Sequence, residues 1–427
     1  MASNAQKKPP VKKRRANGYK MPDRIPKGEV MTDISNNKWV INSSIGIGGF
    51  GEIYSAAKES NKSQNNYVIK VEPSENGPLF CEKTVYLKIG KIEDIKDFMR
   101  LHKLKSLGMP TFYGCGTHMC NNTKFRFLVM ERYGKDLWSI FIENGRIFPP
   151  PTVFRIGIQV LDVLEYIHGK SYVHADIKGA NLLLGLSKGF ENQVYLVDFG
   201  LAARYPSEFK PNPKKAHNGT LEYTSRDAHV GVTTRRGDIE ILGYNMIQWL
   251  SSSLPWEKLT NPSEVESQKN ERMKDCNKFV KNWVKDSGAA DIMSKFLERT
   301  CKLGALEDPN YDLLRRDLHS GASTNKLSFS PPKSPRKSPK AVTGKSVKVV
   351  NTNKDVRAAD PDEPVSKRTR GNRPKVCYVE DDEAEEDEDE DDGDMFKLTP
   401  PKEKSKRSWK DAPTIVSCTE VYSSKKY

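Results

Sequence analysis

The stretch from Tyr172 to Leu184 places three polar side chains among apolar residues, at a spacing that suits one type of reaction. Asp176 could accept the proton of a hydroxyl group, and Lys178 could neutralise a phosphoryl group in transfer. Asn181 could hold a metal ion. We therefore predict transfer of a phosphoryl group to a hydroxyl group, with Asp176, Lys178 and Asn181 as the catalytic residues.

A further carboxylate, Asp198, lies seventeen residues beyond Asn181 in the sequence "VDFGLA". Oxygen ligands of this kind suit Mg²⁺ that bridges nucleotide phosphates. We expect Asn181 and Asp198 to hold Mg²⁺, with ATP as the phosphoryl donor. The alternative is a chance polar cluster in a strand and turn, and the order and spacing of the motifs disfavour it.

A glycine-rich turn precedes these residues, with Gly46, Gly48 and Gly51 in the pattern G-x-G-x-x-G. Glycines allow backbone amides to approach phosphate oxygens closely. Dinucleotide-binding folds share this pattern, but there it joins a strand to a helix, whereas here a strand is expected on each side. The residues expected to cover ATP are Ile45, Gly46, Ile47, Gly48, Gly49, Phe50, Gly51, Glu52 and Ile53.

Lys70 ends the short sequence "VIK", and Glu82 follows twelve residues later. Lys70 could pair with the nucleotide phosphates while Glu82 holds it in position. Taken alone, the two could equally be a surface lysine on a strand and a solvated glutamate on a helix. At the end of the expected strand "FRFLVMER", Met130 should lie at the back of the pocket. Backbone groups from Glu131 to Tyr133 should contact the adenine.

The elements that must position these residues change in type along the chain. The segments "KWVINSSIG", "GEIYSAAKE" and "NYVIKVE" have the composition of strands. Residues 152–168 instead carry apolar side chains at intervals of three and four, which predicts a helix, and residues 238–250 are apolar almost all round, which predicts a buried helix. Strands followed by helices predict an α+β fold with two lobes.

We expect a kinase domain over residues 37–320, with one lobe at about 37–130 and the other at about 134–320. A basic arm, residues 1–36, and a tail, residues 321–427, should be disordered because they are polar and rich in charge. The tail holds three Ser-Pro pairs, a basic cluster, and a block from 380 to 394 in which thirteen of fifteen residues are acidic.

The net charge of +14 favours polyanionic partners such as DNA or nucleosomes, which the basic segments could contact. The sequence contains no apolar run long enough for a transmembrane helix, so no membrane insertion is expected. Seven irregularly spaced cysteines favour reduced intracellular thiols. The cluster "KKPPVKKRR" is typical of a nuclear address.

Several motifs together resemble the vaccinia-related kinases, a branch of the casein kinase one group, over about residues 35–320. They are "VEPSENGPLF", "YVHADIKGANLLL", "VYLVDFGLA", "GTLEYTSRDAHVG" and "RRGDIEILGYNMIQWL". The resemblance implies a serine/threonine protein kinase that uses ATP and Mg²⁺, and we further expect it to be nuclear and monomeric. It also implies chromatin-associated substrates, such as histones and the barrier-to-autointegration factor. Thr220 matches a threonine that braces the catalytic Asp and Lys in serine/threonine-directed kinases.

The chain departs from common kinase patterns at two places. Many catalytic loops read His-Arg-Asp, and the vaccinia-related family usually has Gly in the middle, but this chain has Ala175. Ala175 cannot bind a phosphate on the activation loop, which predicts activity without phosphorylation of that loop. Ser225-Arg226-Asp227 replaces the common Ala-Pro-Glu.

Two other classes of function compete with this interpretation. A pseudokinase scaffold would bind partners without phosphoryl transfer, but pseudokinases usually lack at least one residue of the set that is complete here. A chromatin-binding protein would act mainly through its charged tails. The acidic block could contact histones, or it could be only a solvated spacer.

Overall fold

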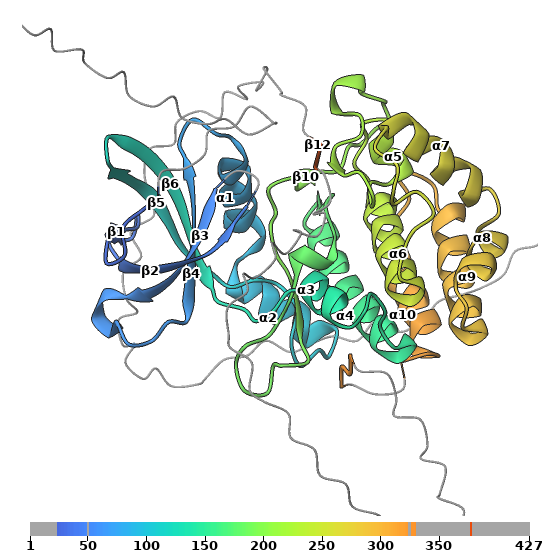
Figure 1. The fold of residues 1–427 in the computed structure, drawn as a ribbon, viewed down its shortest axis with the longest axis horizontal. Helices are drawn as coiled ribbons and strands as arrows, with labels where there is room; N and C mark the ends of the chain where they lie inside the picture. The colour runs from blue at the N-terminus through green and yellow to red at the C-terminus, as the bar shows by residue number, and fades with distance from the viewer. Residues whose placement is uncertain (1–23, 49–50, 323–325, 330–375, 378–427) are drawn as a thin grey trace, which may run out of the picture. The chain divides into compact units, whose positions relative to one another are not determined.

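The first lobe is an antiparallel sheet whose strands run in the order β1-β2-β3-β4-β6-β5 (Figure 1). The computed structural model describes residues 24–48, 51–322, 326–329 and 376–377. The strands of the sheet are β1 (Val30–Thr32), β2 (Lys38–Ile47), β3 (Glu52–Lys58), β4 (Tyr67–Pro73), β5 (Phe112–Cys120) and β6 (Thr123–Glu131). The turn between β2 and β3 is the glycine-rich segment, so strands flank it on both sides as expected.

Two helices accompany this sheet, α1 (Pro78–Ile89) and α2 (Ile92–Leu101). Pro78 begins α1, where its missing N–H removes no helical hydrogen bond. The next backbone N–H, that of Leu79, donates to the buried Glu72 carboxylate at 2.9 Å. Tyr86 of α1 stacks on Phe112 of β5 with ring centroids 5.8 Å apart. These contacts fix the helix that carries Glu82 against the sheet that carries Lys70.

The second lobe is mainly helical, and its helices are labelled in Figure 1. They are α3 (Leu137–Glu143), α4 (Pro150–Gly169), α5 (Arg226–His229), α6 (Arg235–Ser251), α7 (Pro262–Met273), α8 (Cys276–Trp283), α9 (Ser287–Lys302) and α10 (Tyr311–His319). Every residue of α6 from Gly237 to Leu250 is buried, as its apolar sequence predicts. The α+β fold with two lobes is confirmed.

Several short elements complete the described structure, and those between α4 and α5 contain or flank polar residues of the predicted site. They are β7 (Tyr172–Val173), β8 (Leu182–Leu184), β9 (Val194–Leu196), β10 (Ala203–Arg204), β11 (Gly219–Thr220), β12 (Val376–Cys377) and the 3-10 helices η1 (Glu59–Asn61), η2 (Gly179–Asn181) and η3 (Pro213–Lys215). The hairpin of β8 and β9 brings the chain from Asn181 back toward Asp198. None of the described helices is long and apolar enough to cross a bilayer.

The ordered region begins earlier than residue 37, so the predicted disorder of residues 24–36 is wrong. Val30 pairs with Val40 as β1 joins the sheet, and Met31 is fully buried. The Ile25 N–H donates to the Tyr54 hydroxyl at 3.0 Å. A short apolar stretch at the sheet edge therefore outweighs the basic character of the arm. Residues 1–23 lie outside the described part of the chain.

The predicted disorder of the tail is also wrong for a few residues beyond 320. Leu327 is buried, and the Phe329 ring packs edge-on against Phe148 with centroids 5.0 Å apart. The Thr152 hydroxyl donates to the Ser328 carbonyl at 2.6 Å. The backbone of β12 pairs with β11. The rest of the tail, including the basic cluster and the acidic block, lies outside the described residues.

Candidate active site

Asp176 lies in the loop between β7 and η2, with its side chain almost fully buried. Its Oδ1 accepts hydrogen bonds from the Thr220 hydroxyl at 2.7 Å and from the Thr220 N–H at 3.1 Å. Its Oδ2 lies 2.5 Å from Lys178 Nζ, which also donates to Thr220 Oγ1 at 2.9 Å. Thr220 therefore links the catalytic carboxylate and lysine to the segment that contains β11.

Asn181 closes the same loop from the other side. Its amide nitrogen donates to the Asp176 carbonyl at 2.9 Å, so the direction of its side-chain amide is fixed. The backbone carbonyl of Asn181 accepts a hydrogen bond from the Val197 N–H at 2.9 Å. That bond ties Asn181 to the residue just before Asp198, which explains how two residues seventeen positions apart become neighbours.

Lys70 joins three separate elements through its ammonium group. Its Nζ donates to Glu82 Oε2 on α1 at 2.6 Å and to Asp198 Oδ1 after β9 at 2.8 Å. Lys70 and Glu82 are buried, whereas the Asp198 side chain is 41% exposed and so remains accessible to a ligand. The sequence predicted the Lys70–Glu82 pair, but it carried no signal for the direct contact with Asp198.

The charges of this cluster stabilise one another. Burial lowers the pKa of Lys70, but the carboxylates of Asp198 and Glu82 outweigh burial and hold that pKa above its ordinary value. Burial also raises the pKa of Asp198, and the Lys70 ammonium reverses this effect, so the pKa of Asp198 is lowered. At neutral pH the cluster therefore contains a lysine cation and an Asp198 anion.

The donor set at this position fits a hard divalent cation. Asp198 offers carboxylate oxygens, and Asn181 offers an amide oxygen because its nitrogen is committed to Asp176. Oxygen donors are the ligands that Mg²⁺ prefers, together with water and phosphate oxygens. The residues predicted to hold Mg²⁺ are therefore suitable in type.

The backbone of the catalytic loop is held by Asp238, at the start of α6. Asp238 accepts from the His174 N–H at 2.7 Å and from the Ala175 N–H at 2.8 Å. The His174 ring is fully buried, and it packs edge-on against Phe199 with centroids 4.8 Å apart. Burial lowers the pKa of His174, which therefore stays neutral and has a structural role. The sequence did not indicate Asp238, because it is separated from His174 by 64 positions.

The glycine-rich turn shows why one of its glycines is required. A Cβ atom at Gly51 would lie 2.0 Å from the Val71 carbonyl oxygen, so no other residue fits. The Gly48 N–H donates to the Gly51 carbonyl at 2.8 Å, which closes the turn. Ile45 and Ile47 are exposed on β2. Gly49 and Phe50 lie outside the described residues.

Glu52, one of the residues expected to cover ATP, has a side chain that is buried inside the first lobe. The side chain is only 2% exposed, and it accepts a hydrogen bond from the Tyr54 hydroxyl at 2.7 Å. Its carboxylate is therefore turned into the lobe, because the alternation of side chains along β3 places position 52 on the inner face. Only the backbone of Glu52 can belong to a nucleotide-binding surface.

The end of β6 and Tyr133, which follows it, are held by contacts to Thr111 in the loop before β5. Met130 is buried, and the Glu131 N–H donates to the Thr111 carbonyl at 3.0 Å. The Tyr133 hydroxyl accepts from the Thr111 N–H at 2.9 Å, and its ring stacks on Tyr195 with centroids 4.1 Å apart. The Glu131 N–H is thus used within the protein and does not face a ligand.

A buried lysine on α7 holds the chain that follows Thr220. Lys269 Nζ donates to the carbonyls of Leu221 at 2.9 Å and Thr224 at 2.7 Å, and it lies 3.2 Å from His229 Nε2. Lys269 is fully buried, and burial lowers its pKa to about 7. Like Asp238, Lys269 was missed by sequence reasoning, because helix α7 is polar and looks solvent-exposed.

The unusual Ser225-Arg226-Asp227 sequence is anchored by two ion pairs to α6. The Arg226 guanidinium donates to Glu240 through Nε at 3.0 Å and Nη2 at 2.9 Å. Asp227 accepts from Arg236 at 2.5 Å and 3.0 Å. The Asp227–Arg236 pair uses two nitrogens and both carboxylate oxygens, a geometry in which arginine–carboxylate contacts are strong and directional. The segment after the catalytic loop is therefore fixed by charges within the second lobe.

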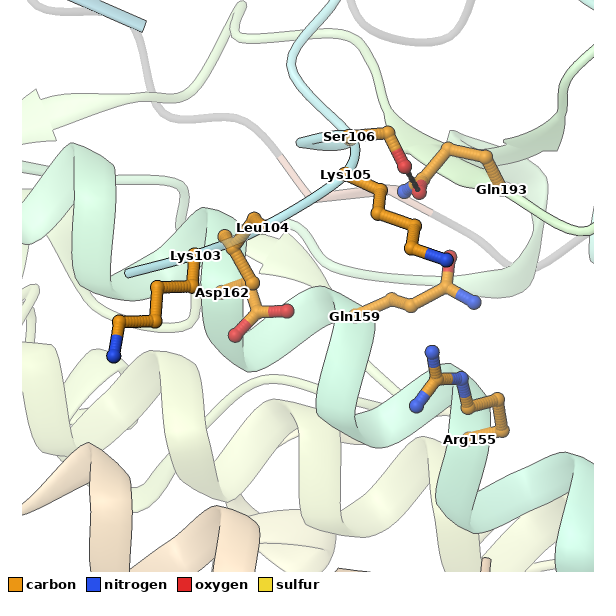
Figure 2. A pocket seen from close by; sticks show the side chains of 9 residues that line it. Lys103, Leu104, Lys105, Ser106, Arg155, Gln159, Asp162 and Gln193 are labelled. Carbon is orange, nitrogen blue, oxygen red and sulfur yellow. Dashed lines mark hydrogen bonds between the residues drawn. The ribbon is translucent and has the colours of Figure 1, made fainter. Parts of the chain in front are cut away.

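A separate hollow of about 220 Å³ lies between the loop after α2 and helix α4 (Figure 2). Figure 2 shows Lys105, Gln159, Arg155 and Gln193 around it, and Ser106 donates to Gln193 at 2.5 Å. None of the residues that line it belongs to the catalytic set. The hollow is therefore not the place of the predicted reaction.

Comparison with protein families finds a match to the protein kinase domain over residues 39–305. A structure of vaccinia related kinase 3 superposes with a TM-score of 0.63 and 28% identity, covering 70% of this chain and 91% of that chain.

Two curated relatives share more of the sequence. Nucleosomal histone kinase 1 of Drosophila melanogaster is 47% identical over 330 residues, which are 76% of this chain and 55% of the relative. Human serine/threonine-protein kinase VRK2 is 43% identical over 322 residues, which are 73% of this chain and 63% of the relative. The matched part thus spans less than two thirds of either relative.

Proposed function

Since the chain belongs to the vaccinia-related branch of the serine/threonine protein kinases, we propose that it transfers the γ-phosphoryl group of ATP to serine and threonine side chains of chromatin-associated proteins. One observation carries this proposal. Asp176, Lys178 and Thr220 form one hydrogen-bonded cluster, while Lys70, Glu82 and Asp198 form an ion-paired cluster beside Asn181.

In the proposed reaction, Asp176 accepts the proton of the substrate hydroxyl, and Thr220 holds the carboxylate in place. Lys178 neutralises charge on the phosphoryl group in transfer, and Lys70 binds the phosphates that remain on the nucleotide. Asp198 and Asn181 would hold Mg²⁺, which supplies further neutralisation of phosphate charge when bound. The chemistry needs mainly positioning and charge, which these rigid contacts provide.

We place the nucleotide under the turn from Ile45 to Ile53. Met130 would line the back of the pocket, and the backbone of Glu131 and Tyr133 would contact the adenine. The Glu131 carbonyl is the candidate acceptor, because the Glu131 N–H is already bonded to Thr111. Glu82 would act by holding Lys70, without touching ATP itself.

The Drosophila relative is named for histones of the nucleosome, which supports histones as a substrate class. The resemblance to the family adds the barrier-to-autointegration factor to the proposal, and we further propose a nuclear location and a monomeric state. Contact with DNA or nucleosomes would come from the basic segments in residues 1–23 and in the tail, which lie outside the described residues.

Phosphoryl transfer by Asp176 is tested by changing that residue alone. Asp176→Ala should lower the rate of phosphate incorporation into histones by at least about 10²-fold, the usual contribution of a positioned general base. ATP binding, measured by the ligand-induced rise in Tm, should persist because Asp176 does not contact the nucleotide. Asp312→Ala, at an exposed aspartate of α10, is the matched control and should retain wild-type activity. Equal rates for Asp176→Ala and wild type would overturn the proposal.

A further inference from the structure

Two cysteine side chains far from the catalytic residues in sequence lie against each other in the second lobe. Cys276 begins α8 and Cys301 lies near the end of α9, and Figure 1 shows these helices packed side by side. Their sulfur atoms are 2.8 Å apart. This separation is longer than the S–S bond of ~2.05 Å but shorter than the sum of two sulfur van der Waals radii. Formation of a bond would need only a small movement of the two side chains.

The two thiols are not equivalent. Cys301 Sγ accepts a hydrogen bond from Arg226 Nη2 at 3.6 Å, and Cys301 is partly exposed, whereas Cys276 is buried. Glu240 holds the Arg226 guanidinium in this position through two hydrogen bonds. An adjacent cation stabilises a thiolate, which is the reactive form of cysteine.

The pKa values of the two thiols also differ, and that of Cys301 is the lower one. A hydrogen bond from the Cys276 thiol lowers the pKa of Cys301, burial opposes this, and the Arg226 guanidinium lowers the pKa further. The pKa of Cys276 is raised, first by the same hydrogen bond and then by burial. By contrast, burial raises the pKa of Cys115 in the first lobe, and no cysteine partner lies beside it in the described part of the chain. Cys301 is therefore suited to attack an oxidant, and Cys276 to supply the second thiol.

We propose that Cys276 and Cys301 form an oxidative modification site, in which a peroxide converts the two thiols into a reversible disulfide between α8 and α9. The Cys301 thiolate attacks one oxygen of hydrogen peroxide, so an S–O bond forms, the O–O bond breaks and hydroxide leaves. The Cys276 thiol then loses its proton and attacks the Cys301 sulfur. The S–S bond forms, the S–O bond breaks, and the second hydroxide combines with the released proton as water.

The proposed disulfide would lie beside Arg226, which anchors the segment after Thr220 to α6. It would close a loop between residues 25 positions apart, which restricts the unfolded chain. The oxidised protein should therefore melt at a higher temperature, by about 5 °C or more for a lobe of this size. This site does not depend on phosphoryl transfer, so its test is separate from that of the proposed function.

The full chain should be treated with hydrogen peroxide, digested without reduction and examined by peptide mass spectrometry. We expect a peptide pair joined through Cys276 and Cys301, lighter by two hydrogens and separated again by dithiothreitol. Cys115 should stay unmodified under the same conditions. The absence of this cross-link, at peroxide concentrations that oxidise exposed Cys81, would overturn the proposal.

Single variants test the assigned roles. In Cys276→Ser, Cys301 has no second thiol, so its sulfenic acid should accumulate and react with dimedone. In Cys301→Ser, Cys276 should remain unlabelled because it lacks the Arg226 contact. Both variants should show a Tm that peroxide does not raise. Dimedone labelling of Cys276 in Cys301→Ser, equal to that of Cys301 in the other variant, would show that the assignment is wrong.

Discussion

Ala175 and Asp198 both hold left-handed backbone conformations, with φ of 63° and 67°. This region is costly for residues with a Cβ atom, by roughly 1–2 kcal/mol. The contacts that impose it are visible. The Ala175 N–H is bonded to buried Asp238, and the Asp198 side chain is bonded to Lys70. Backbone strain thus occurs at Asp198, which is proposed to hold Mg²⁺, and at Ala175 beside Asp176, and such strain is common at functional sites.

The conformation of Ala175 explains why a related chain would favour glycine at this position. Ala175→Gly should stabilise the protein by about 0.5–1 kcal/mol, because relief of the strain exceeds the added freedom of the unfolded chain. The measurement is the free energy of unfolding from denaturant titration. Ala290→Gly, inside α9, is the matched control and should destabilise by about 1 kcal/mol or more. A loss of stability in Ala175→Gly as large as in the control would contradict this account.

At the scale of elements, the segment after the catalytic loop is fixed by α6 and α7. Lys269 of α7 binds two of its carbonyls and lies near the rings of Tyr244 at 5.3 Å and Trp256 at 5.5 Å. Thr220, which belongs to the same segment, forms hydrogen bonds with Asp176 and Lys178 of the catalytic loop. We expect these contacts to order the segment without the phosphate that an arginine at position 175 would bind.

We therefore predict that enzyme made in bacteria and treated with phosphatase keeps its activity. Thr220 and Thr224 are buried, and phosphate on Thr220 would repel the Asp176 carboxylate, whereas Ser207 is exposed. The measurement is the rate of histone phosphorylation before and after dephosphorylation. A large fall in rate that is restored by phosphate at Ser207, Thr220 or Thr224 would contradict the prediction. Phosphorylation of serines in the tail would not.

Lys269 should also give the protein a characteristic pH dependence. Because burial lowers its pKa to about 7, from the ordinary value of 10.5, the unfolded chain binds more protons than the folded chain between these values. Stability contributed by Lys269 must then rise with pH above 7. We expect wild type to gain stability relative to Lys269→Met as pH rises from 7 toward 10.

The Lys269→Met variant leaves the carbonyls of Leu221 and Thr224 without their donor, at a cost of about 1–3 kcal/mol for each buried group. It should raise KM for protein substrates more than KM for ATP, since the affected segment lies beyond the proposed nucleotide site. Lys274→Met, at the exposed end of α7, is the control. A stability difference that stays constant with pH would show that Lys269 is not the titrating group.

At the scale of the whole molecule, charge is distributed in blocks. The net charge is +14, and removal of the thirteen acidic residues between 380 and 394 would leave +27. Basic clusters on either side of the domain suit DNA phosphates, where each neutralised phosphate releases counterions. The acidic block lies near the basic cluster "SKRTRGNRPK" in sequence and could compete with DNA for it.

Deletion of 380–394 should therefore raise the affinity of the full chain for DNA and steepen its salt dependence. Transfer to a short peptide should change little, because the deletion leaves every residue of the proposed catalytic set in place. The effect should fade at high salt, since the Debye length is about 8 Å at physiological ionic strength. The measurement is a salt titration of DNA binding for both chains. Equal binding at low and moderate salt would show that the block is a spacer or a contact for another partner.

The class of fold and the type of enzyme could be predicted from the sequence. Apolar periodicity over residues 152–168 and 238–250 depends only on local spacing, and both helices form close to the expected positions. Lys70, Glu82, Asp176, Asn181 and Asp198 are recognisable because their order and spacing recur with their motifs. In the structure, Lys70 contacts Glu82 and Asp198, and Asn181 contacts Asp176.

The groups that hold the predicted site residues in place became visible only in the folded protein. Asp238 forms a hydrogen bond with His174, which lies 64 positions away in the sequence, and Lys269 forms one with Leu221, which lies 48 positions away. The inward turn of Glu52 and the order of residues 24–36 also depend on packing against other elements. No local pattern marks such residues, because a side chain's partner depends on how distant segments pack. Burial then sets its charge, as the lowered pKa of Lys269 illustrates.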